Sequence, residues 1–140
     1  MTRNFRSVAR LVFAVAAPLF AGCGGGGPKL HPVRGKVLYM ERPAEGAIVV
    51  FQPLNSGPDS LMPSGTVGAD GRFSLRTHSH GEGAPAGTYV VLITWMPPNS
   101  RERETPQNQL PPKYASPTES PFRVTVEART NELEPFRLTK

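Results

Sequence analysis

Proline and glycine are spread along most of this chain, and they limit it to short extended segments. The sequence has 16 prolines and 14 glycines among its 140 residues, and only Pro18 and Gly22 of these lie in the first 22. Proline removes a backbone donor and clashes with the preceding turn of a helix, and glycine also lowers helix stability. Long helices are therefore disfavoured after residue 22, and short strands joined by turns are expected.

Between these breaks, apolar and polar residues alternate with the period of two that is typical of half-buried strands. The segment GTYVVLITW is apolar on both faces, as a central strand would be. The predicted strands are 31–39, 47–52, 64–67, 72–76, 87–95, 122–127 and 132–138. Their number and spacing predict an all-β domain, a seven-stranded antiparallel β-sandwich.

A few residues also predict how the strands are joined. Segment 41–46 reads as a turn in which Gly46 can take a positive φ. Asp70-Gly71 is the strongest turn signal, and it predicts a tight hairpin between strands 64–67 and 72–76. Pro135 restricts the last strand to the edge of a sheet, because proline cannot donate to a central ladder.

The first 22 residues have the organisation of an export signal. Three arginines and no acidic residue precede the apolar run 11–20, and the small residues Ala21 and Gly22 follow it. Ten helical residues span roughly 15 Å, about half of the roughly 30 Å hydrocarbon core of a bilayer. We therefore expect residues 1–22 to be a signal peptide rather than a permanent transmembrane helix.

Cys23 is the single cysteine of the chain, so it cannot form an intramolecular disulfide. Residues 20–23 resemble a lipobox, which implies cleavage before Cys23 and attachment of acyl chains to its sulfur. Phe20 stands where a lipobox usually has leucine, and an ordinary secretory signal with another cleavage site, or a free thiol, remains an alternative. Residues 23–30, rich in glycine, are expected to tether a single domain, 31–140, to the membrane.

The charge gives little reason to expect nucleic-acid binding. Three of the 16 basic residues lie in the signal, and the remaining 13 exceed the 11 acidic residues by two. No run of five or more basic residues occurs, so no stripe for a phosphate backbone is visible. We therefore expect no nucleic-acid partner.

Several short segments follow one another in a characteristic order: Gly35-Lys36-Val37, Pro43, Gly46-Ala47, 49–53, 69–73, 85–89, Pro112-Lys113-Tyr114 and Asn131-Glu132-Leu133. Together they resemble the carboxypeptidase regulatory-like domain. The chain is also similar to small lipoproteins of planctomycete type that carry this domain, and the likeness covers about residues 32–138. The resemblance implies a transthyretin-like sandwich with Ig-like Greek-key connections, usually an accessory or adhesive module without chemistry of its own.

The titratable residues give weak grounds for catalysis or metal binding. His78 and His80 would lie on one side of an extended segment, with His31 as a third nitrogen donor and Glu82 as the nearest carboxylate. A solvated loop with incidental histidines is the preferred interpretation. No Gly-x-Ser-x-Gly motif is present. We expect no enzyme activity, no metal and no cofactor.

The expected function is that of a membrane-anchored exported lipoprotein. Its β-sandwich would be a non-catalytic structural or protein-interaction module of the cell envelope, on the periplasmic or cell-surface side. The alternative is a carbohydrate-binding module that uses the proline-rich segment 96–120 and a platform of Tyr89, Trp95 and Tyr114. The expected partners are the membrane, through acyl chains on Cys23, and an envelope protein or glycan.

Overall fold

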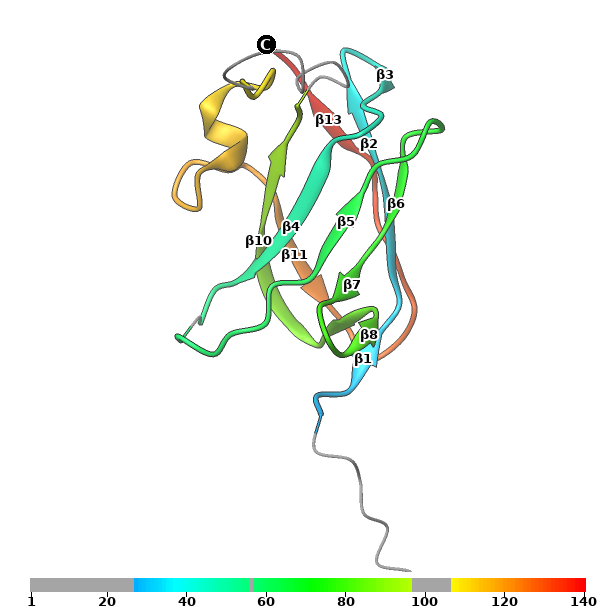
Figure 1. The fold of residues 1–140 in the computed structure, drawn as a ribbon, viewed down its shortest axis with the longest axis vertical. Helices are drawn as coiled ribbons and strands as arrows, with labels where there is room; N and C mark the ends of the chain where they lie inside the picture. The colour runs from blue at the N-terminus through cyan, green and yellow to red at the C-terminus, as the bar shows by residue number, and fades with distance from the viewer. Residues whose placement is uncertain (1–26, 56, 97–106) are drawn as a thin grey trace, which may run out of the picture.

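The computed structural model describes residues 27–55, 57–96 and 107–140, which form an all-β domain consistent with a β-sandwich (Figure 1). In these residues no helix is long and apolar enough to cross a membrane. The elements are β1 (Leu30–His31), β2 (Val33–Tyr39), β3 (Arg42–Pro43), β4 (Ile48–Pro53), β5 (Ser64–Thr66), β6 (Arg72–Ser74), β7 (Arg76–Thr77), β8 (Gly81–Glu82), β9 (Ala84–Pro85), β10 (Gly87–Thr94), the 3₁₀ turn η2 (Pro112–Ala115), β11 (Arg123–Val126), β12 (Asn131–Glu132) and β13 (Phe136–Leu138).

The first sheet has the order β11-β10-β4-β5-β7-β8. Its longest strand, β10, runs antiparallel to β4, with Val91 opposite Phe51 and Ile93 opposite Val49. All four side chains are fully buried. The prediction of a central strand at 87–95 is therefore confirmed, because β-branched and aromatic residues pack well on a pleated, buried surface.

The second sheet is built around β2, and it corrects the prediction that all pairings are antiparallel. β3 and β6 pair with β2 antiparallel, whereas β12 and β13 pair with it in parallel. The chain leaves β11 and turns back through 127–131 beside the start of β2, so its last strands run in the direction of β2. The predicted strand 132–138 is interrupted at Pro135, which lies between β12 and β13. Both pieces pair only with β2, so this part of the chain is at a sheet edge, as the proline predicted.

The predicted hairpin around Asp70-Gly71 forms only in part. The turn is present, with Gly71 at φ +83°. The strand after the turn, β6, pairs with β2. Among the described residues, the only residue pair that joins β5 to the continuation of this strand, β7, is Ser64 with Arg76. The buried Leu75 extends the pairing with β2, since its N–H donates to the backbone oxygen of Val33 at 3.0 Å. The chain reaches the first sheet only after Leu75, at β7. This strand thereby joins the two sheets, which a local hairpin would not do.

Part of the proline-rich segment packs against the core. Leu110 and Tyr114 are buried, and the Tyr114 ring stacks on Phe122 at a centroid distance of 5.8 Å. Phe122 contacts Phe136 at 4.9 Å, and Phe136 stacks on Phe73 at 6.1 Å. This aromatic row connects η2 to both sheets. Residues 97–106 of the same segment lie outside the described residues.

The turn between β2 and β3 consists of Met40 and Glu41, at φ 50° and 65°. Two consecutive positive φ values are those of a type I′ turn, which strongly favours Asn-Gly because side chains with a Cβ are strained there. The sequence placed this turn later, at 41–46, since neither residue is a turn former; the predicted positive φ of Gly46 is present, at 84°. Methionine at this position is therefore unexpected on local grounds.

We expect Met40→Asn to raise the free energy of unfolding by about 0.5–1 kcal/mol, because asparagine tolerates the left-handed region better than methionine. Met96→Asn is the matched control, since Met96 is also exposed but lies outside the positive-φ residues. Urea unfolding of both variants measures the difference. Equal effects of the two substitutions would show that the turn stores no strain.

Candidate functional site

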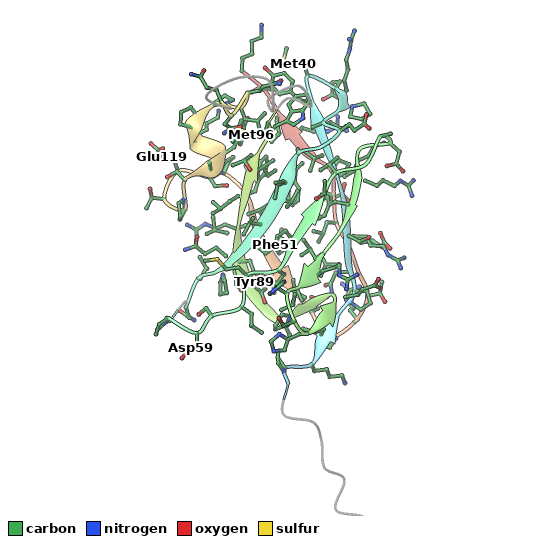
Figure 2. The ribbon with its side chains drawn as sticks, viewed as in Figure 1. Met40, Phe51, Asp59, Tyr89, Met96 and Glu119 are labelled. Carbon is green, nitrogen blue, oxygen red and sulfur yellow. The ribbon has the colours of Figure 1, made fainter. Side chains whose placement is uncertain are left out.

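Two exposed methionines and two half-buried aromatic residues lie at one end of the domain. We call this group the distal pole and define it as Tyr39, Met40, Trp95 and Met96. Figure 2 shows Met40 and Met96 at the same end of the molecule. The described residues begin at the opposite end, where β1 lies (Figure 1). The first described residues therefore lie far from the distal pole.

Two strand ends position the aromatic residues of the distal pole. Tyr39 is the last residue of β2, and Trp95 directly follows β10. Their rings meet edge to face, with centroids 5.6 Å apart and an interplanar angle of 63°. The indole N–H of Trp95 donates to the backbone oxygen of Glu45 at 2.7 Å. Packing and this hydrogen bond together fix the orientation of the indole ring.

Asn108 attaches the returning chain to the distal pole. Its side-chain oxygen accepts hydrogen bonds from the backbone N–H groups of Trp95 at 2.9 Å and Leu110 at 3.2 Å. The N–H of Gln109 donates to the backbone oxygen of Trp95 at 2.8 Å. Backbone and side-chain hydrogen bonds thus join Trp95, which precedes segment 97–106, to Asn108 and Gln109, which follow it.

The two methionines are the most exposed part of the distal pole. Met40 is 51% exposed and Met96 is 40% exposed. The Met40 N–H donates to the backbone oxygen of Leu138 at 3.0 Å, and Glu41 forms an ion pair with Arg137 beside it. Methionine side chains are flexible and polarizable, so they adapt to varied apolar surfaces. A rigid aromatic base with adaptable apolar side chains suits contact with another protein.

The histidines predicted as possible metal ligands are not assembled into a site. His31 is buried in β1, whereas His78 and His80 are exposed between β7 and β8. A ring nitrogen of His80 lies 2.9 Å from the backbone oxygen of His78. In the described residues, no group of three or more His, Cys, Asp or Glu side chains could hold a metal ion. Cys23, the predicted lipid-attachment residue, lies outside these residues.

Two of the three aromatic residues predicted as a sugar platform belong to the core. Tyr89 is buried, and its hydroxyl donates to the backbone oxygen of Pro85 at 2.7 Å. This burial raises the pKa of Tyr89 above its ordinary value. Tyr114 is also buried, and its hydroxyl accepts a hydrogen bond from the Thr139 N–H at 3.0 Å. A stacking platform is therefore reduced to Trp95.

Met40 and Met96 were not singled out by the sequence. They are 56 positions apart, and only the ends of β2 and β10 bring them to one end of the domain. Their single signal in the sequence is that each follows an aromatic residue at a strand end. That signal is too common to identify a site without the topology.

Comparisons with known proteins found no relative from which a function could be transferred. No protein-family model matches the chain, and neither a curated protein nor a solved structure matches it.

Proposed function

We propose that this protein is an exported lipoprotein, anchored through acyl chains on Cys23, whose β-sandwich contacts an envelope protein through the distal pole. The β-sandwich acts by contact and performs no catalysis. Its finer architecture is that of a transthyretin-like, seven-stranded Greek key, as in the carboxypeptidase regulatory-like domain. The crossing of one strand from the second sheet to the first at Leu75 supports such a two-sheet topology.

The observation that carries this proposal is the position of the distal pole. It lies at the end of the domain away from β1 and hence away from a tether that precedes residue 27. An anchor at one end would direct the exposed methionines away from the membrane. Met40 also has a positive φ, which strains the backbone of a residue with a side chain, and it is exposed. Backbone strain is concentrated at functional sites, and exposed apolar residues often mark contact surfaces.

A photoreactive side chain tests this contact in living cells. Installed at position 40, it is expected to form one discrete cross-linked product with a protein. Installed at position 59 it should not, because Asp59 is exposed at the other end of the domain (Figure 2). Met96→Glu should reduce the product at position 40, since a charge would then be buried in the interface.

Two results would contradict the proposal. Equal products from positions 40 and 59 would mean that the distal pole is not a specific interface. The second contradicting result has two parts: a folded Trp95→Ala variant is no longer retained on cell-wall polysaccharide, and position 40 gives no cross-linked protein product. This result would replace the protein contact by the carbohydrate-binding function.

A further inference from the structure

A polar groove, distinct from the distal pole, follows β6 and β7 along the side of the domain where the two sheets meet. Three adjoining hollows form it, and Ser74 lines all three. The first hollow lies beside Lys36 and Arg72, and the second between Arg34 and Arg76. The third has a volume of about 630 Å³ and reaches the β7–β8 segment.

Four cations, Arg34, Lys36, Arg72 and Arg76, border this groove together with two carboxylates. Glu132 lies beside Arg34, and Glu82 stands opposite Arg76 in the register of β7 and β8. Arg34 lies 3.7 Å from Glu132, in a pair in which both side chains are more than half exposed. Such exposed ion pairs contribute at most about 1 kcal/mol and yield readily to another anion. In the described part of the chain, no carboxylate lies within 4.0 Å of the charged ends of Lys36 and Arg76.

The strongest sign of an external anion is a repulsive cross-strand pair. Lys36 on β2 stands directly opposite Arg72 on β6 in the antiparallel register. Side chains in directly opposite positions lie about 5 Å apart at Cβ, and like charges there destabilise a sheet. Arg72 has a carboxylate of Asp70 at 3.8 Å, but both side chains are largely exposed. An anion held between Lys36 and Arg72 would convert this repulsion into attraction.

The remaining groups of the groove are suited to a sugar more than to a protein. The hydroxyl groups of Ser64, Thr66 and Ser74 line it, and they make no side-chain hydrogen bond with other described residues. A protein interface would instead have large apolar anchors at its centre. Of the exposed large apolar residues described, only Ile48 borders the groove.

We propose that this groove binds an extended, carboxylated polysaccharide. The carboxylates pair with Lys36, Arg72 and Arg76, and the sugar hydroxyls exchange hydrogen bonds with the serine and threonine side chains. Because the three hollows are open to solvent and follow one another along the groove, several successive sugar units are needed for binding. This site would be separate from the proposed protein contact at the distal pole.

Binding of fluorescent oligogalacturonate to the purified full chain in detergent micelles tests the proposal. Arg72→Glu is the decisive variant, because it removes the repulsion with Lys36 while reversing a charge in the groove. We expect its affinity for oligogalacturonate to fall by about tenfold or more, as for loss of a charge-assisted hydrogen bond. Its urea unfolding midpoint should change little, because the new attraction to Lys36 offsets the lost pair with Asp70, so misfolding would not explain the loss of binding.

Arg42→Glu is the matched control, since it makes the same charge change at an exposed residue of β3 that does not line the groove. Its affinity should change by less than about twofold. Equal weakening by both substitutions, or no binding by the unmodified protein, would overturn the proposal. Poly-glutamate binding as tight as oligogalacturonate binding would overturn the polysaccharide assignment. Cross-linking at position 40 should be unaffected by Arg72→Glu, which separates this site from the distal pole.

Discussion

Cys23→Ala should move the protein almost completely from the membrane fraction to the soluble fraction. Each buried methylene of an acyl chain contributes about 0.8 kcal/mol, so two or more chains hold a protein stably on a bilayer. Without them, the apolar run 11–20 is too short to replace the anchor. Cell fractionation measures the anchoring. The mass of the N-terminal peptide of the native protein measures the acylation of Cys23.

Gly25→Ala is the control for Cys23→Ala, because it alters the same glycine-rich segment without removing the sulfur. It should leave the protein in the membrane fraction. A Cys23→Ala protein that remains there, or an unmodified Cys23 in the native protein, would contradict lipid anchoring. The domain would then have to reach its partner as a freely secreted protein.

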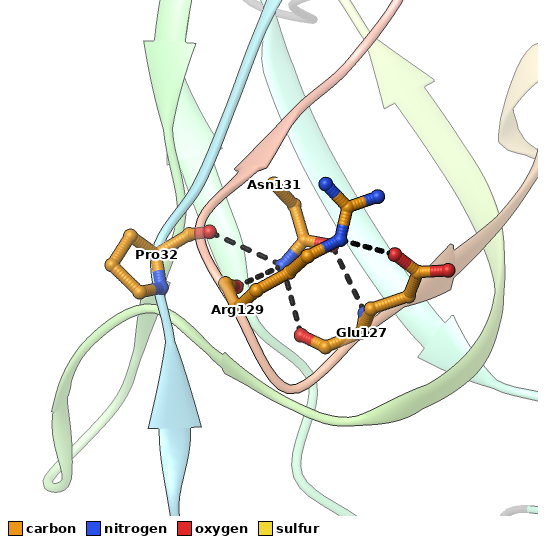
Figure 3. Close-up of polar contacts among 4 residues, drawn as sticks. All are labelled: Pro32, Glu127, Arg129 and Asn131. Atoms are coloured by element: carbon orange, nitrogen blue, oxygen red, sulfur yellow. Dashed lines mark hydrogen bonds and ion pairs between the residues drawn. The ribbon is translucent and has the colours of Figure 1, made fainter.

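Asn131→Ala should lower the free energy of unfolding by roughly 2–4 kcal/mol, because the buried Asn131 side chain makes three hydrogen bonds to the backbone of its turn, and all three would be lost. Figure 3 shows the Asn131 side chain inside the turn between β11 and β12. Its oxygen accepts from the Glu127 N–H at 2.9 Å, and its amide group donates to the backbone oxygens of Arg129 at 2.7 Å and Glu127 at 3.1 Å. The Asn131 N–H also donates to the oxygen of Pro32 at 2.8 Å, next to the start of β2.

The position of Asn131 explains why the effect should be large. Its hydrogen bonds shape the turn that returns the chain beside β2, so the parallel pairing of β12 with β2 depends on them. Thr130→Ala is the matched control, because Thr130 is exposed in the same turn, and its effect should stay within about 0.5 kcal/mol. Urea unfolding compares the two variants. A loss for Asn131→Ala as small as that for Thr130→Ala would show that the turn does not determine the pairing.

The sequence predicted the strands better than their partners, and the reason is physical. The spacing of apolar residues in 87–95 and 122–127 indicates which faces of a strand are buried, and this is a local property of the sequence. The strands β10 and β11 form in these two segments. Pairing is set by contacts between distant segments. The strand after Asp70-Gly71 pairs mainly with β2, through β6 and the N–H of the buried Leu75, and pairs with β5 only at Arg76. No local pattern encodes that choice.

The candidate sites were harder to predict because each depends on the topology. The distal pole combines the ends of β2 and β10, and its key turn is formed by Met40 and Glu41, which local preferences do not favour. The polar groove depends on the register that sets Lys36 opposite Arg72. Both outward-facing residues are visible in the alternating pattern, but their proximity is not.

The central claim is that the anchored domain contacts its partner through the distal pole, and cross-linking at position 40 with and without Cys23 tests it most directly. The prediction is one discrete protein product in the acylated chain, identified by mass spectrometry, and a strongly reduced product in the Cys23→Ala background. An undiminished product from the unanchored chain, or the same product from position 59, would contradict the claim.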